Sequence, residues 1–320
     1  MLDRGIYMNK LLRKLGIVLL SISLVMGLTG CGNEENQVED NGKLNIVTTT
    51  TMLYDLVLNI AGEHANVEAL MGPGIDPHMY QASAGDVTTM QKADIVVYNG
   101  LHLEGKMGDI FAALNEQGKQ VICASDTIDP SELLSDENNP EIYDPHIWFD
   151  VNIWKTVAQH VGDQLSVFDP EHAEDYAANL ASYLVELDEL DKYIASRASE
   201  LDEEHRVLVT AHDAFRYFGK AYNFEVKGLQ GISTDAEAGT ADVSNLAKFI
   251  ASNGIKAIFI ETSVPPKNIE ALQAAVKAQG FEVAIGGELY SDSLGDENSG
   301  DETYIKTCMA NIDTIVDALK

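Results

Sequence analysis

The sequence predicts an α/β protein of two lobes, each with a parallel-sheet core wrapped by helices, joined by a single long connector helix. Short apolar segments rich in β-branched residues alternate with helical patterns from residue 44 to 167, and the alternation returns from 206 to 319. Between these halves, residues 169–204 contain no glycine and, after Pro170, no proline. Strand–helix alternation is typical of parallel sheets covered by helices.

The first 30 residues have the pattern of a secretory signal peptide. Basic residues from Lys10 to Lys14 precede an apolar run at 15–28 that is too short for a stable membrane span. The run ends in Leu28-Thr29-Gly30-Cys31, which resembles the bacterial lipobox, in which the cysteine is acylated and becomes the new N-terminus. The alternative is a plain signal with a chance cysteine. We expect residues 1–30 to be a signal peptide and 31–42 a polar, lipidated tether.

The chain is strongly acidic, with 51 acidic against 21 basic residues and a net charge of −30. This charge argues against nucleic acid as a partner, since phosphates would be repelled, and it makes a cation the more plausible ligand. Cys123 and Cys308 each lie in an apolar stretch without CxxC spacing. We interpret them as small core residues, with a disulfide or ligand pair as the alternative.

The predicted first lobe comprises residues 43–168. Its strands are expected at 44–50, 67–71, 94–98 and 121–124, and its helices at 51–61, 84–91, 103–117 and 151–167. Residues 125–143 are acidic and turn-rich, as in a surface loop. Parallel sheets bind ligands beyond the carboxyl ends of their strands, so the loop after 67–71 is a candidate binding segment.

The predicted connector, residues 169–204, begins with Asp169-Pro170-Glu171, which suits the first turn of a helix. Apolar residues recur every 3 or 4 positions, and the helix would be about 50 Å long. The alternative is a helix within a bundle. The predicted second lobe, 205–320, has strands at 206–210, 224–229, 257–260 and 281–285, and helices ending at 220, 253, 279 and 319.

Three histidines stand where ligands are expected. His78 and His146 each follow an Asp-Pro pair, in which proline restricts the backbone and therefore the direction of the imidazole. His212 lies at the carboxyl end of the strand at 206–210. Singly, each is more often a structural histidine; jointly, on two lobes, they favour a metal site in the cleft between the lobes. We expect His102, a weaker candidate, to be explained by capping or packing.

A cation bound by three imidazoles needs a carboxylate to offset its charge. Asp292, in a glycine-bounded loop after a strand, is the best candidate, ahead of Glu261, Asp235 and Glu237. Other carboxylates could orient the imidazoles from behind, although turn formation also explains several of them; these are Asp76, Asp144, Asp213 and Glu261.

Several motifs together resemble the zinc/manganese receptors of bacterial ABC importers, the TroA-like extracytoplasmic solute-binding proteins. They are the stretches 72–80, 84–86, 98–107, 143–150, 210–215 and 288–293, and the resemblance covers residues 43–320. It implies two α/β lobes that are joined by one long helix and hold a single divalent metal through His78, His146, His212 and Asp292. It also implies an ABC permease with its ATPase subunit as partners, and a monomer anchored by lipid outside the bacterial cell membrane.

The resemblance leaves zinc and manganese both open. Members regarded as manganese-dedicated often have glutamate at the position of His212, and many zinc-dedicated members carry a histidine-rich loop before His146; this chain has neither. Val151 replaces a proline common after the preceding aspartate. Three imidazoles and a carboxylate suit zinc, so we expect tighter zinc binding in vitro.

The favoured function is therefore metal capture and delivery rather than catalysis. Four protein ligands would close the coordination shell, whereas a catalytic zinc keeps a position for water or substrate. Two other functions stay open at this point: a surface adhesin or structural lipoprotein with a metal staple, and a zinc-dependent hydrolase.

Overall fold

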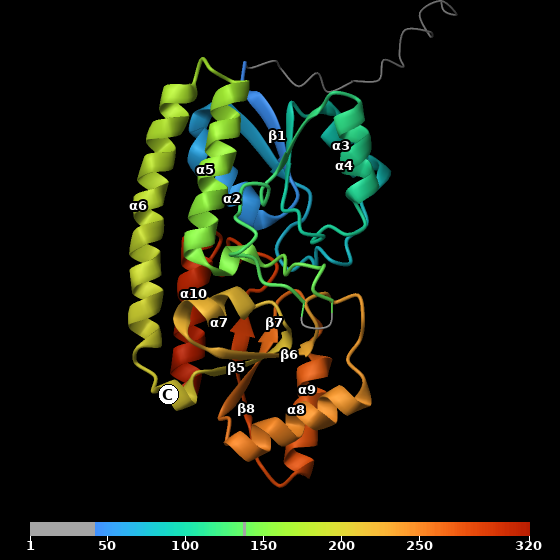
Figure 1. Cartoon of the computed structure of the whole chain (residues 1–320), viewed down its shortest axis with the longest axis vertical. Coiled ribbons are helices and arrows are strands. Elements are labelled where there is room, and N and C mark those ends of the chain that lie inside the picture. Colours follow the sequence, from blue (N-terminus) through green and yellow to red (C-terminus); the bar gives the residue numbers. More distant parts are fainter. Residues whose placement is uncertain (1–41, 137–138) are drawn as a thin grey trace, which may run out of the picture. The chain divides into compact units, whose positions relative to one another are not determined.

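The structure is a computed structural model that describes residues 42–136 and 139–320 (Figure 1). The predicted signal peptide, Cys31 and nearly all of the tether lie outside the described residues. The α/β class is confirmed: parallel strands alternate with helices along the chain. The strands are β1 (Leu44–Thr48), β2 (Ala65–Ala69), β3 (Ile95–Tyr98), β4 (Gln120–Cys123), β5 (Val207–His212), β6 (Glu225–Gln230), β7 (Ala257–Glu261) and β8 (Ala284–Leu289).

The helices agree with the predicted order, with some shifted ends. They are α2 (Thr51–Ala61), α3 (Ala84–Lys92), α4 (Gly108–Glu116), α5 (Val151–Phe168), α6 (Ala173–Ala198), α7 (Arg216–Tyr222), α8 (Thr240–Asn253), α9 (Lys267–Ala278) and α10 (Tyr304–Leu319), with short 3-10 turns η1 (Gly62–His64), η2 (Ile147–Phe149) and η3 (Glu203–His205). Thr50 caps α2 and Asp150 caps α5 by accepting hydrogen bonds from backbone N–H groups.

The first half contains one four-stranded parallel sheet in the order β2-β1-β3-β4. Alternate residues along the strands face opposite sides of this sheet. Ile46 and Val97 share a core with α2 and α5, whereas Val47 and Val96 pack with Met90 of α3 and with residues of α4. Because all four strands are parallel, their carboxyl ends meet at one edge, from which the loops after β2 and β4 emerge.

In the second half, residues 205–320, the strands form two separate parallel pairs, β5-β6 and β7-β8. The strand predicted at 281–285 runs instead from 284 to 289 and includes Gly286 and Gly287, which we expected in a loop. A side chain at Gly286 would come within 2.7 Å of the Ala318 side chain, so glycine lets α10 approach the strand. This close approach overrides the local turn preference of the glycine pair.

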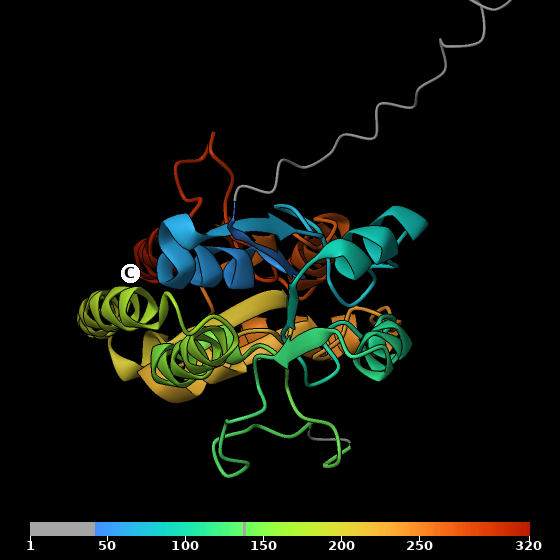
Figure 2. The same ribbon diagram turned by 90° about the horizontal axis from the view of Figure 1, so that it is seen from above.

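The connector helix is shorter than predicted. α6 has 26 residues, about 39 Å, instead of running from 169 to 204. The side chain of Asp169 binds the His172 ring at 2.7 Å and the Tyr176 hydroxyl at 2.7 Å, so residues 169–172 form a turn before the helix. α6 also has helical neighbours that we did not expect: it packs against α5, α2 and α10, and Figures 1 and 2 show it beside α5.

Lys43–Lys320 form one compact unit. The predicted lobe boundaries at 168 and 204 therefore stay a prediction. In the described part of the chain, no helix combines the length and the apolar character needed to cross a membrane.

The helix predicted at 103–117 begins only at Gly108. Gly100, Leu101 and His102 have positive φ angles of 87°, 52° and 65°, which a helix cannot include. The buried carboxylate of Glu104 holds this turn by accepting from the Asn99 N–H at 2.8 Å and the Gly100 N–H at 3.3 Å. This left-handed turn precedes the predicted helix, and residues 103–107 continue it as turns, so regular helix begins only at Gly108.

Candidate metal centre

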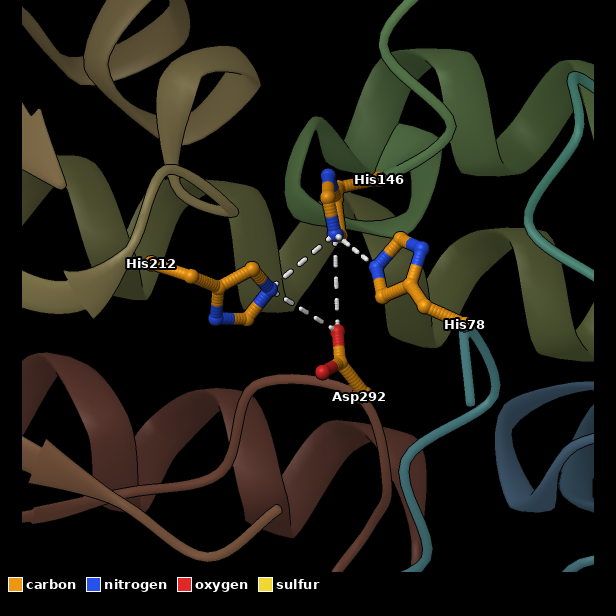
Figure 3. A group of neighbouring side chains, drawn as sticks. All are labelled: His78, His146, His212 and Asp292. Atoms are coloured by element: carbon orange, nitrogen blue, oxygen red, sulfur yellow. Dashed lines mark hydrogen bonds and ion pairs between the residues drawn. The ribbon is translucent and has the colours of Figure 1, made fainter. Parts of the chain in front are cut away.

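Four side chains from distant parts of the sequence meet at one buried point (Figure 3): His78, His146, His212 and Asp292. One ligand atom from each lies within 4.8 Å of the others. His146 Nε2 is central, at 3.2 Å from His78 Nε2 and 3.3 Å from His212 Nε2. Asp292 Oδ1 lies 3.5 Å from His146 Nε2 and 3.4 Å from His212 Nε2. The geometry is that of a compact cluster of three imidazoles and one carboxylate.

The two Asp-Pro-His segments form the same local structure. In one, the His78 N–H donates to Asp76 Oδ1 at 2.9 Å, and in the other the His146 N–H donates to Asp144 Oδ1 at 3.0 Å. Each aspartate thus closes a tight turn over the intervening proline, as Asx turns do. The repeated sequence therefore positions two histidines by one device, which local chemistry alone specifies.

Carboxylates orient two of the rings from behind. Asp144 Oδ1 lies 2.7 Å from His146 Nδ1, and Glu261 Oε2 lies 2.5 Å from His212 Nδ1. Glu261 also accepts from the His212 N–H at 2.9 Å, so it fixes both the backbone and the ring. A hydrogen bond at Nδ1 leaves Nε2 directed at the centre with its lone pair available, which is the usual arrangement of metal-binding histidines.

Asp292 has one satisfied oxygen and one unsatisfied oxygen. Its Oδ2 accepts from Ser263 Oγ at 2.9 Å, and that hydroxyl also contacts Ser291 Oγ at 2.8 Å. Its Oδ1 is buried and, among the described residues, has no hydrogen-bond partner. Buried polar atoms are nearly always paired, so an unpaired carboxylate oxygen facing imidazole nitrogens fits a site for a cation.

The electrostatics of the cluster are those of strongly interacting buried groups. Burial dominates at His78 and lowers its pKa to about 3, so this ring is neutral at neutral pH. Burial also opposes charge on His146 and His212, but the carboxylates of Asp144, Glu261 and Asp292 outweigh it and raise both pKa values. Burial likewise opposes ionisation of Asp292, yet His212 and His146 hold its pKa well below the usual range. Protons and a metal ion would thus compete for the same Nε2 atoms.

Not every predicted carboxylate reaches the cluster. Asp213 Oδ2 faces Arg216 at 3.6 Å instead of an imidazole, and Asp235 pairs with Lys106 at 3.4 Å. Glu237 is exposed, as is His102 in its left-handed turn. Cys123 and Cys308 are both free and partly buried, so they form no disulfide.

Sequence reasoning also missed contributors that carry no local signal. Arg216 Nη1 lies 3.7 Å from Asp144 Oδ2, which places a positive charge behind the His146 ring. Asn99 donates to the carbonyl of Pro145 at 3.0 Å and so steadies the same segment. Ser263 holds Asp292. Asn99 lies within the stretch 98–107 and Arg216 directly follows 210–215, but no sequence pattern says which group either side chain contacts, so tertiary contact alone reveals these roles.

Comparison with known proteins gives consistent matches over most of the chain. The family model described as "ZnuA: Zinc-uptake complex component A periplasmic" matches residues 46–318. The chain is 46% identical over 300 residues to the zinc-binding protein TroA of Treponema pallidum (strain Nichols), covering 94% of this chain and 96% of that protein. It is 41% identical over 305 residues to the manganese-binding lipoprotein MntA of Bacillus subtilis (strain 168), covering 95% and 99%.

A solved structure agrees. The periplasmic zinc binding protein TroA from Treponema pallidum superposes with a TM-score of 0.84 at 48% sequence identity, covering 87% of this chain and 99% of that one.

Proposed function

Because the chain belongs to the family of periplasmic zinc-uptake component A proteins, we propose that it is an extracytoplasmic receptor for a divalent transition metal. In this function it captures one zinc or manganese ion and delivers it to an ABC-type membrane permease. His78, His146, His212 and Asp292 would be the four ligands. The ion is the cargo of the protein.

The unpaired Asp292 Oδ1 beside the imidazole nitrogens is the observation that carries this proposal. Four of the separations between ligand atoms are 3.2, 3.3, 3.4 and 3.5 Å. A tetrahedral zinc ion with ligands at about 2.0–2.1 Å requires ligand atoms roughly 3.3–3.4 Å apart. These four of the six separations in the cluster are therefore already close to the spacing that a bound ion would impose.

Binding rather than catalysis is favoured by burial. The exposed fractions are 3% for His78, 0% for His146 and His212, and 1% for Asp292. Four protein ligands fill a tetrahedral shell, which leaves no position for a reacting water or substrate. A site filled in this way would lack the open coordination position on which a zinc-dependent hydrolase depends.

Zinc and manganese are both supported as cargo, since the related proteins are named for one metal or the other. Three nitrogen ligands favour zinc on affinity, because the Irving–Williams order places zinc above manganese at such a site. In the cell, however, metal supply also decides which ion fills the site. We therefore expect tighter zinc binding in vitro without assigning the physiological cargo.

The location and partners follow from the N-terminal pattern and the family. Residues 1–30 would direct export, and acylated Cys31 would anchor a tethered monomer at the outer face of the membrane, beside the permease and its ATPase subunit. Metabolic labelling with palmitate tests the anchor: we expect label in the wild-type chain and none in Cys31→Ser. Label in both would exclude acylation at Cys31.

Elemental analysis of the protein purified from its own cell envelope tests the function directly. We expect close to one zinc or manganese ion per chain, and calorimetric titration of the stripped protein should give the same stoichiometry. Absence of binding to either metal would overturn the receptor. Chelator-sensitive peptidase or phosphoesterase activity would instead support a hydrolase, and metal that is bound but never exchanged would favour a structural staple.

A further inference from the structure

His78 is held differently from the other three members of the cluster. The rings of His146 and His212 are bonded at Nδ1 to buried carboxylates, and Asp292 is bonded to Ser263. Within the part of the chain that the structure describes, no group is hydrogen-bonded to His78 Nδ1. His78 lies in the loop 72–80, which has no regular secondary structure and follows β2. Its position therefore depends on what holds this loop.

Asp76 links this loop to the second half of the chain. One carboxylate oxygen, Oδ1, accepts from the His78 N–H at 2.9 Å. The other, Oδ2, accepts from the Thr234 hydroxyl at 2.6 Å. Thr234 stands 158 residues away, in the segment between β6 and α8. A single carboxylate thus connects the backbone of His78 to a side chain in the segment that follows β6.

Two further contacts link residues in or near these segments. The Gly74 N–H donates to the Oγ of Ser293, the residue directly after Asp292, at 2.8 Å. Lys106 Nζ lies 3.4 Å from Asp235 Oδ1, next to Thr234, but both side chains are partly exposed, at 31% and 58%. An ion pair so exposed contributes little, whereas a hydroxyl bonded to a half-buried carboxylate is one of the stronger types of hydrogen bond.

We propose that Thr234 is a positioning residue that keeps the His78 loop closed over the metal and thereby sets the rate of metal release. This inference rests on the proposed receptor function. Without the Thr234 hydroxyl, Asp76 Oδ2 loses its donor and the 72–80 loop loses its shortest contact with the second half. His78 can then leave the ion more often, and a three-ligand site exchanges metal faster than a four-ligand site.

The arrangement also couples release to movement. Asp292 and His212 belong to the second half, as does Thr234. Any displacement of the second half away from the loop would break the Thr234–Asp76 bond in the same step that withdraws two ligands. His78 would be released together with them, so the site would open as a unit.

The test uses Co²⁺ as an absorbing probe and measures its release into excess EDTA by stopped flow. Thr234→Val removes the hydroxyl and keeps the shape, and Thr234→Ser keeps the hydroxyl. We expect release about tenfold faster in Thr234→Val, the factor that corresponds to ~1.4 kcal/mol, and near wild-type release in Thr234→Ser. Exposed Thr240, at the start of α8, gives the matched control Thr240→Val, which should not change the rate.

A double variant separates positioning from general damage. If Thr234 acts through His78, then adding Thr234→Val to His78→Ala leaves the release rate of His78→Ala unchanged. Equal acceleration in both backgrounds, or Thr234→Ser releasing as fast as Thr234→Val, would overturn the inference. Thr234→Ala provides a second hydroxyl-free variant, and the melting temperature of the metal-free protein reports any folding defect. Failure of the wild-type chain to bind Co²⁺ or Zn²⁺ at all would overturn the receptor function instead.

Discussion

His212 and Glu261 are the last residues of β5 and β7, and the Glu261 carboxylate binds both the ring Nδ1 of His212, at 2.5 Å, and its backbone N–H, at 2.9 Å. Neither side chain is exposed. The two strands belong to different pairs, so this contact joins them at their carboxyl ends. It makes the direction of the His212 ring a property of the second-half packing rather than of the local sequence.

Alanine variants of the two buried carboxylates, Asp292 and Glu261, should distinguish a metal ligand from a group that only orients a ligand. Glu261→Ala frees the His212 ring, and loss of such an outer contact typically weakens metal binding about 10–100-fold. Asp292→Ala removes the one anionic group of the cluster and should weaken binding more than this. Competition with a fluorescent chelator measures both affinities, with the exposed Glu270→Ala as the control that should bind normally. Equal losses of affinity in the two variants would contradict the assignment of Asp292 as the ligand and of Glu261 as the group that orients His212.

Metal should stabilise the folded protein strongly. An ion that binds the folded chain alone adds about 4 kcal/mol to the free energy of unfolding at a thousand times its dissociation constant. Scanning calorimetry of the stripped protein, with and without zinc or manganese, measures the accompanying rise in melting temperature. His146→Ala removes the central ligand and should abolish most of the rise. A rise that persists in this variant would place the metal elsewhere.

Asp55 should make stability depend on pH. Burial raises its pKa from 3.8 to about 6, against the opposing hydrogen bond from the Tyr304 N–H. Because the folded state holds this proton more tightly, the contribution of Asp55 to the free energy of unfolding is greatest below about pH 4 and is lost as the pH rises through 6. The loss is at most ~3 kcal/mol, from 1.36 kcal/mol for each unit of the shift in pKa.

Asp55→Asn cannot ionise, and its amide oxygen can still accept from the Tyr304 N–H. Urea unfolding at pH 4 and pH 8 should therefore show this variant gaining stability over wild type at the higher pH, with little difference at the lower. Asp109→Asn, at an exposed position in the first turn of α4, is the control. Parallel pH profiles for wild type and Asp55→Asn would refute the assignment.

Gly228 should be essential to the position of His212. A side chain there would come within 2.6 Å of the Asp213 Cα and of the His212 carbonyl carbon, and backbone atoms cannot move aside cheaply. Gly228→Ala is therefore expected to lower the free energy of unfolding by roughly 1–3 kcal/mol, the usual cost of overpacking, and to weaken metal binding. Denaturant unfolding and zinc titration measure the two effects.

Nearby Gly231 is a matched control for this change, since no atom lies within 4 Å of the side chain that Gly231→Ala would add. We expect Gly231→Ala to bind zinc like the wild type. If Gly228→Ala also binds normally, the strands must be able to separate without moving His212.

Much of the fold could be read from the sequence because its signals are local. Apolar periodicity and strand–helix alternation predicted the α/β class and most elements. The errors arose where tertiary contacts overrule local preference. Gly286 and Gly287 lie in β8 because α10 packs against them, and Glu104 holds a turn where periodicity suggested a helix. Similarly, the carboxylate of Asp169 binds the His172 ring in a turn, and α6 begins at Ala173 instead of at the predicted residue 169.

For the candidate site, the sequence by itself determined the two Asp-Pro-His turns, since proline and an aspartate two residues before each histidine fix the backbone locally. It also indicated His212 and Asp292, because parallel strands present their carboxyl ends to ligands. Only the tertiary structure decided that Glu261 orients His212 and that Thr234 binds Asp76. It also decided that Ser263 binds one oxygen of Asp292 while the other oxygen has no hydrogen-bond partner. These contacts join side chains that are up to 158 residues apart in the sequence. Packing of the folded chain brings such side chains together, and no local sequence pattern specifies it.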